Sequence, residues 1–298
     1  MKSYAYHSNI SFKTKILNQF RKIFTSGSPE KFLLKKVFAA KDDSLWLKVI
    51  PPEYSYPKNS WRNYQRNGIK LRLDISNVVD HVKYFAFKDL GFENFIAMLQ
   101  PNYTVLDIGA NIGLTGLEFA KHCPEGKVIC FEPSPENFKR LNENVALNSF
   151  KNITALNTGI GDAPGQFKLY NVVDTNPGMK RILNDGNAEN FESELITIDT
   201  LESQLNKLNI QKVGAIKIDV EGFEFKVLLS AVFILQKYKP VLFIELDDSN
   251  LKGQNSSALE LVNYLTGLNY KVYDAQKINQ QIVAGFDYSN CHFDIICN

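Results

Sequence analysis

From residue 104 onward, short apolar runs alternate with longer amphipathic segments. Short apolar runs are typical of strands buried in a parallel sheet, and apolar residues at every third or fourth position are typical of helices that cover such a sheet. The predicted strands are 104–108, 127–131, 153–158, 215–218, 241–245, 270–273 and 293–297. The predicted helices are 114–122, 133–148, 201–208, 224–236 and 256–268. This alternation predicts an α/β domain with right-handed crossover connections.

Two departures from strict alternation refine this prediction. The last two strands have no helix between them, which indicates a hairpin, so strand 293–297 should run antiparallel to its neighbours. Segments 165–173 and 195–198 also have strand-like patterns, the first after a Pro-Gly turn. We therefore expect a seven-stranded, mostly parallel sheet with an antiparallel last strand, and extra strands inserted after its third strand.

The first hundred residues follow a different pattern. Segment 68–74 alternates like a strand, segment 80–99 is helical with an interruption near Gly91, and three prolines at 51, 52 and 57 separate them from an earlier helical stretch. The sequence thus predicts an N-terminal region over 1–100, mainly helical, and a catalytic domain over 101–298. The first region would serve as a lid or as a surface for substrate or membrane.

Charge is unevenly distributed. The net charge of the chain is +2, yet residues 1–50 hold ten Lys or Arg against three acids. Within 10–25, one helical face collects apolar side chains, namely Phe12, Ile16, Phe20, Ile23 and Phe24, and the flanks hold Lys13, Lys15, Arg21 and Lys22. Such a helix either lies on an anionic membrane or packs its apolar face against its own domain, and packing is the commoner case.

No apolar run is long enough to span a bilayer, and the N-terminus lacks the apolar core of a secretory signal. The four cysteines (Cys123, Cys130, Cys291 and Cys297) contain no CxxC pair, which favours buried free thiols over a zinc site. We therefore expect a cytoplasmic protein. Peripheral contact with the inner face of the membrane through residues 10–25 is the alternative to a helix that packs on its own domain.

Residues 105–113 read VLDIGANIG, a strand followed by a glycine turn and the start of a helix. Gly109 and Gly113 tolerate positive φ and leave backbone bare for a ligand, and Asn111 stands where dinucleotide-binding turns have their middle glycine. Without that glycine, and with Asp107 adding negative charge, a pyrophosphate is disfavoured. The acid suits the ammonium and sulfonium of S-adenosylmethionine.

A second acid supports this cofactor. Glu132 ends the strand 127–131, and an acid at the end of the second strand commonly binds the ribose hydroxyls. The alternative is a glycine turn that merely joins a strand to a helix. The spacing of Asp107, the glycines and Glu132 favours the nucleotide-type ligand.

The segment IKIDVEGFE (216–224) is a second motif. It places Asp219 and Glu221 at the end of a strand, where open α/β sheets bind their ligands. Lys217 shares a strand face with Asp219, so an internal salt bridge is an equally sound interpretation. Glu245 closes the next strand at the same edge and either receives a substrate proton or caps backbone. Paired carboxylates could also hold a divalent cation, but no further ligands are forced by the spacing and we do not favour a metal.

Together, VLDIGANIG (105–113), FEPSPENFKRLNENVALN (131–148), GIGDAPG (159–165), LITIDTL (195–201) and IKIDVEGFE (216–224) resemble the FkbM family of S-adenosylmethionine-dependent methyltransferases. The resemblance implies a class I, Rossmann-like fold and O-methylation of a hydroxyl on a sugar, glycan, glycolipid or natural product. By the same resemblance Asp107, Gly109, Asn111 and Gly113 form the cofactor loop, Glu132 is the ribose acid and Asp162 contacts adenine. The position of Asp219 at a strand end, and not the resemblance, places it beside the cofactor. Asp219, Glu221 and Glu245 are the candidates for catalysis.

Two other classes of function remain as alternatives. A nucleic-acid methyltransferase could use the basic arm to track phosphates, but the rest of the chain is acidic and contains no recognisable RNA-binding module. A non-catalytic scaffold could bind the cofactor without turnover, although both motifs are intact. We therefore expect a small-molecule or glycan acceptor.

Overall fold

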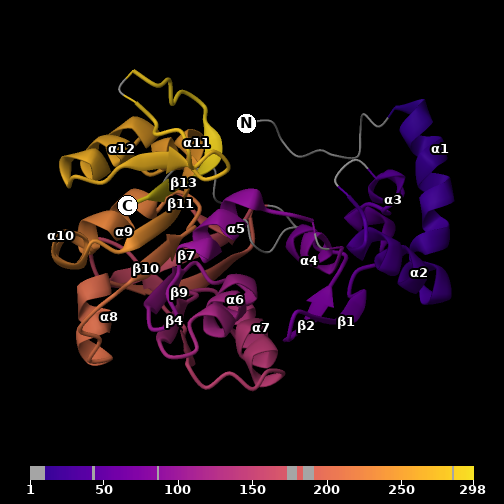
Figure 1. Cartoon of the computed structure of the whole chain (residues 1–298), viewed down its shortest axis with the longest axis horizontal. Coiled ribbons are helices and arrows are strands. Elements are labelled where there is room, and N and C mark those ends of the chain that lie inside the picture. Colours follow the sequence, from indigo (N-terminus) through magenta and orange to yellow (C-terminus); the bar gives the residue numbers. More distant parts are fainter. Residues whose placement is uncertain (1–10, 42–43, 86, 173–179, 184–190, 284) are drawn as a thin grey trace. The chain divides into compact units, whose positions relative to one another are not determined.

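The computed structural model describes residues 11–41, 44–85, 87–172, 180–183, 191–283 and 285–298 (Figure 1). They form two compact units. The first comprises the chain up to Tyr64 together with Leu71–Lys88, and the second comprises Gln65–Lys70 and Asp89–Asn298. The role predicted for residues 1–100 stays a prediction.

The first unit is mainly helical. Its helices are α1 (Phe12–Arg21), α2 (Gly27–Phe38), α3 (Leu45–Lys48) and α4 (Val78–Tyr84), with 3-10 turns at Lys22–Phe24 and Glu53–Ser55. A buried ion pair fixes their packing: the Arg62 guanidinium donates to both oxygens of Glu30 at 2.8 Å, and Tyr84 Oη donates to the same carboxylate at 2.6 Å. Glu30 therefore connects α2 to α4 and to the strand that contains Arg62.

The strands β1 (Trp61–Arg66) and β2 (Ile69–Asp74) form a hairpin whose tip, Gln65–Lys70, belongs to the second unit and whose remaining residues belong to the first. Asn67 and Gly68 both have positive φ, 51° and 82°, as a tight Asn-Gly hairpin turn requires. The predicted helix 80–99 is divided into α4 and α5 (Leu90–Ala97). The break precedes Asp89, whose carboxylate accepts from Phe92 N at 3.0 Å and so starts a new helix, whereas Gly91 lies inside α5.

The seven-stranded sheet of the second unit has the order β12-β13-β11-β10-β3-β4-β5. Its strands are β3 (Thr104–Ile108), β4 (Lys127–Phe131), β5 (Ile153–Leu156), β10 (Ala215–Ile218), β11 (Val241–Asp247), β12 (Val272–Asp274) and β13 (His292–Cys297). All neighbouring pairs are parallel except those of β13, which runs antiparallel to both β11 and β12. The predicted sheet and its antiparallel last strand are confirmed.

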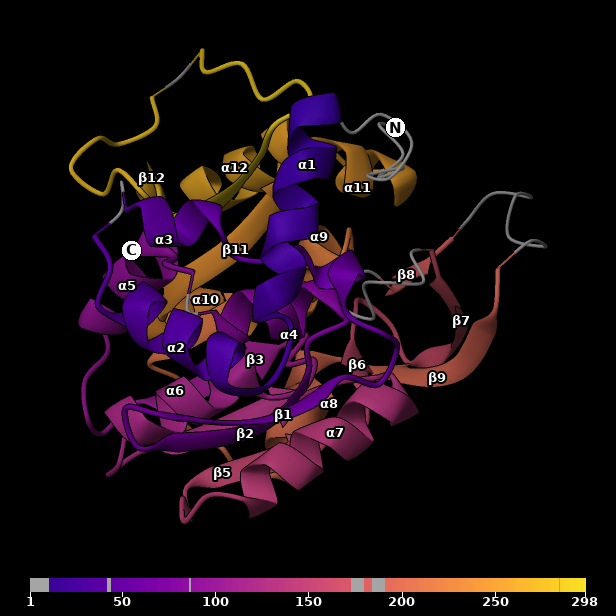
Figure 2. The same ribbon diagram turned by 90° about the vertical axis from the view of Figure 1, so that its right-hand side faces the viewer.

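Helices cover both faces of this sheet (Figures 1 and 2). Side chains alternate along each strand, so Val105 of β3 packs in one core with α5, α6 (Leu114–His122) and α7 (Pro135–Ala146). Leu106 and Ile108 face the opposite core. The helices of that core include α8 (Leu201–Lys207), α9 (Glu224–Ser230), α10 (Val232–Tyr238) and α12 (Ala258–Gly267). The strands of the sheet are therefore packed against helices on both faces, which fixes the positions of their ends.

A second sheet is formed by the strands that follow β5 in the chain, where the sequence indicated extra strands. It has the order β6-β9-β7-β8, with β6 (Gly159–Ile160), β7 (Gly165–Asn171), β8 (Lys180–Ile182) and β9 (Ser193–Asp199). The predicted third strand therefore ends at Leu156, and β8 was not predicted. Residue 173, assigned to a strand from sequence, lies outside the described residues. Within the described part of the chain, no helix is long and apolar enough to cross a membrane.

Candidate active site

The loop between β3 and α6 adopts the left-handed backbone that its composition predicts. Gly109, Asn111 and Gly113 have φ of 81°, 49° and 85°, and Gly113 is the N-cap of α6. Gly109 also approaches the end of β10 so closely that a Cβ atom would overlap the backbone oxygen of Asp219. Only glycine fits this position, because of both its dihedral angles and its neighbour.

Asp107 lies beneath this loop. Its side chain is fully buried, Oδ2 accepts from Thr115 Oγ1 at 2.7 Å, and Oδ1 lies 3.7 Å from Lys217 Nζ. Burial raises the pKa of Asp107, and Lys217 and Thr115 oppose that shift. We expected this acid to face the cationic end of the cofactor. That role stays a prediction; in the structure the buried Asp107 supports the loop from within through Thr115 and Lys217.

Lys217 joins the two motifs. Its buried ammonium donates to the backbone oxygen of Gly109 at 3.0 Å and pairs with Asp219 Oδ2 at 3.0 Å. Burial lowers the pKa of Lys217, but Asp219 and Asp107 outweigh it and hold the pKa above its ordinary value. The salt bridge within the second motif is confirmed, and it leaves Asp219 partly exposed at the end of β10.

Glu132 follows β4 and ties the glycine loop to the next helix. Its two carboxylate oxygens accept from Asn111 N at 2.8 Å and from Ser134 N at 2.9 Å. Burial raises the pKa of Glu132 to about 7 despite both hydrogen bonds. Its contact with a ribose stays a prediction, as does the contact of the exposed Asp162, which follows β6, with an adenine.

Glu221 has an unusual backbone for its residue type, with φ of 55° beside Gly222 at 111°. This turn brings its carboxylate to Arg181 of β8, whose Nη2 lies 3.0 Å from Oε2, and to Asn250 Nδ2, 3.1 Å from the same oxygen. Burial and the nearby carboxylates Asp219 and Glu224 raise the pKa of Glu221 to about 7, and Arg181 moderates the shift.

Glu245 of β11 completes a cluster of three carboxylates. One oxygen each of Asp219, Glu221 and Glu245 lies within 4.8 Å of the others. Glu245 Oε2 is buried and has no hydrogen-bond partner among the described residues. Burial, reinforced by the neighbouring acids, raises the pKa of Glu245 well above its ordinary value. The three catalytic candidates predicted from separate strand ends are therefore brought together.

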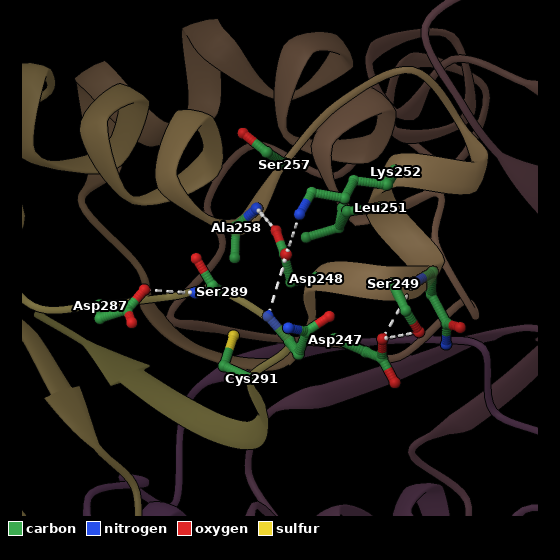
Figure 3. Close-up of polar contacts among 12 residues, drawn as sticks. Asp247, Asp248, Ser249, Leu251, Lys252, Ser257, Ala258, Asp287, Ser289 and Cys291 are labelled. Carbon is green, nitrogen blue, oxygen red and sulfur yellow. Dashed lines mark hydrogen bonds and ion pairs between the residues drawn. The ribbon is translucent and has the colours of Figure 1, made fainter. Parts of the chain in front are cut away.

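Two residues of this site were missed at the sequence level. Arg181 lies on a three-residue polar strand, and Asn250 lies in the short helix α11 (Asp248–Gly253); neither has a local pattern that marks it. Asp247 fixes α11 by accepting from Asn250 N at 2.9 Å. Figure 3 shows the adjoining support, in which Asp248 accepts from Ala258 N and pairs with Lys252 at 2.6 Å.

The chain is similar to known methyltransferases. The model of the methyltransferase FkbM domain matches residues 107–272. Methyltransferase sdnD of Sordaria araneosa is 26% identical over 161 residues, which cover 45% of this chain and 62% of that protein. Methyltransferase 1 of Beauveria bassiana is 28% identical over 150 residues, 45% of this chain and 60% of that protein. The alignments thus span about three-fifths of these relatives.

Among solved structures, the FkbM methyltransferase of Methylobacillus flagellatus is similar at 15% identity and a TM-score of 0.47, covering 74% of this chain and 52% of that one. The family match is the stronger finding, because it spans more than half of the chain and includes both the glycine loop and the carboxylate cluster. The chain therefore belongs to the FkbM methyltransferase family.

Proposed function

We propose that this protein transfers a methyl group from S-adenosylmethionine to a hydroxyl of a sugar, glycan, glycolipid or natural product. One observation carries the proposal: the carboxylate cluster Asp219, Glu221 and Glu245 adjoins the left-handed glycine loop, with Lys217 touching both. A cofactor on the loop would therefore present its methyl group near groups that can take a proton.

The reaction needs two things from the protein. The acceptor oxygen attacks the methyl carbon in line with the carbon–sulfur bond, so a carbon–oxygen bond forms as S-adenosylhomocysteine leaves. The sulfonium is already a good leaving group, so the protein mainly aligns the two reactants. The hydroxyl proton must also leave, and a carboxylate with a pKa near neutrality is suited to accept it.

We assign this proton to Glu221. Its pKa of about 7 leaves much of it ionised at neutral pH. Its Oε2 is held by Arg181 and Asn250, so the side chain is fixed and Oε1 is the atom we assign as acceptor. Asp219 is less suited because Lys217 already pairs with it, and Glu245 is less suited because burial disfavours its charged form and raises its pKa well above the ordinary value.

A divalent cation is the alternative activator, since the three carboxylates lie close enough to share one hard ion. Arg181 and Lys217 already compensate two of these carboxylates, which is why we prefer direct proton transfer. Dialysis against a chelator separates the two mechanisms. Activity that is lost and returns with Mg²⁺ assigns the proton transfer to a cation-bound hydroxyl instead of Glu221.

The test uses S-adenosylmethionine with a labelled methyl group and extracts of surface glycans, lipids and RNA. We expect label in a glycan or lipid product. Glu221→Gln should bind the cofactor with wild-type affinity in calorimetry but lose most of its turnover. The control is Glu143→Gln, which removes the same charge from the exposed side of α7 and should change neither.

Glu132→Ala should show the opposite pattern. Losing the hydrogen bonds to Asn111 N of the glycine loop and to Ser134 N before α7, together with an acid at the cofactor side, should weaken binding by about 1–3 kcal/mol. Absence of cofactor binding by the wild-type protein would refute the proposal. Binding without any labelled product would favour a scaffold, and label found only in RNA would favour a nucleic-acid methyltransferase.

A further inference from the structure

We propose that α1 is a membrane-docking helix that inserts its outer face among anionic lipids. The inference does not rest on the proposed methyl transfer, since it concerns a surface of the first unit. It begins from an apolar stripe. Phe12, Ile16, Phe20 and Ile23 recur at helical spacing, and their exposed fractions are 77%, 58%, 50% and 57%.

The opposite face of α1 is the one that packs. Asn18 is buried and donates to Tyr54 Oη at 2.8 Å, and Arg21 Nε donates to Lys48 O at 3.0 Å. These contacts fix the rotation of the helix, because they use the side chains on the face opposite the stripe. The simpler expectation, that the apolar face covers the domain, is therefore wrong for these four side chains.

The charges beside this stripe indicate what it binds. Lys13 lies on one edge of it, Lys15 and Lys22 lie on the other, and all three are exposed. The first acidic residue of the chain is Glu30, which is already paired with Arg62. An apolar stripe between two rows of lysines complements the apolar depth and the anionic headgroups of a membrane surface.

A second copy of this chain fits less well. Two such helices placed face to face would bring their lysines together with no acid from either helix to compensate them. The structure therefore favours anionic phospholipid, and self-association becomes an outcome that the test can detect.

The full chain is mixed with vesicles of phosphatidylcholine alone or of equal parts phosphatidylcholine and phosphatidylglycerol, and bound protein is measured by sedimentation. We expect binding to the anionic vesicles only, and a decline as salt rises. Binding that ignores lipid charge, or no binding at low salt, overturns the proposal.

Two pairs of variants assign the surface. Ile16→Gln with Phe20→Gln removes the stripe, and the matched control Phe233→Gln with Leu259→Gln removes two half-exposed apolar side chains from α10 and α12. We expect at least a tenfold loss of vesicle binding in the first pair and none in the second. Equal binding by both pairs overturns the proposal.

The lysines are tested in the same way. Replacing Lys13, Lys15 and Lys22 by Gln should weaken vesicle binding at least tenfold. Replacing the exposed Lys127, Lys139 and Lys237 by Gln should leave vesicle binding unchanged. Thermal unfolding confirms that each variant is folded. If the wild-type protein forms dimers in solution that Ile16→Gln with Phe20→Gln dissociates, the stripe is a contact between copies and the membrane proposal fails.

Discussion

Gly109→Ala should destabilise the second unit by more than its backbone angle alone can explain. At φ of 81° any L-residue costs about 1 kcal/mol. The new Cβ would also overlap the backbone oxygen of Asp219, which cannot rotate away because Asp219 N is bonded to Ile108 O at 3.1 Å. Overpacking of this kind adds about 1–3 kcal/mol. The expected total is about 2–4 kcal/mol.

Two other glycines separate these contributions. Gly68 has nearly the same φ, 82°, but no atom within 4 Å of its Cβ position, so Gly68→Ala should cost only about 1 kcal/mol. Gly267 ends α12 with open space and an ordinary φ, so Gly267→Ala should stabilise the helix by about 0.5–1 kcal/mol. All three lie in the second unit, which allows direct comparison.

Differential scanning calorimetry of the full chain measures the effect. For a unit of this size, about 2–4 °C is lost per kcal/mol, so the Tm should fall by about 4–16 °C in Gly109→Ala and by about 2–4 °C in Gly68→Ala. Equal losses in these two variants would show that the loop absorbs the overlap. The close approach of Gly109 to β10 would then not constrain the site, contrary to our reasoning.

Three further outcomes follow from the charges of the site. Lys217→Met should lower the free energy of unfolding by about 3–5 kcal/mol in chemical denaturation, because the buried Asp107 and the partly exposed Asp219 lose their counter-ion. Arg181→Gln should raise the pKa of Glu221 above about 7 and move the rising limb of kcat against pH to higher pH; an unmoved limb would exclude Glu221 as the base. Burial raises the pKa of Glu224 to about 7, so its contribution to stability is present below pH 4.5 and is lost as pH rises through 7. Between pH 4.5 and pH 7, Glu224→Gln should therefore lose about 3 kcal/mol less of its free energy of unfolding than the wild type does. Urea unfolding at a series of pH values measures this difference.

The large sheet was predictable because its signal is local and repeated. Each strand of the seven-stranded sheet is a short, mainly apolar run between turn residues, and one missing helix sufficed to predict the antiparallel β13. Boundaries were less predictable. Asp89 starts α5 through a side-chain hydrogen bond that competes with the more visible Gly91, and Ala231 separates α9 from α10 within one apolar pattern.

The sequence predicts which site residues lie at strand ends. It does not predict the direction in which their side chains point, because that direction depends on residues of other elements. Asp219, Glu221 and Glu245 follow two neighbouring strands, so their meeting could be inferred from topology. The inward direction of Asp107 depends on Thr115 and Lys217, which come from other elements. Arg181 reaches the cluster from a second sheet, and no periodic pattern in its own segment reveals this contact.

Lys217 has a consequence for how such proteins diverge. A single ammonium contacts Asp107, Asp219 and the backbone of Gly109, so the two motifs share one counter-ion although they lie more than a hundred positions apart in the chain. A neutral replacement at position 217 leaves two acids uncompensated, and a neutral replacement at both acids leaves a buried ammonium alone. Lineages should therefore keep or exchange these three side chains as a set, and position 217 should covary with 107 and 219 among relatives. Exposed positions around these three side chains are free to change one at a time.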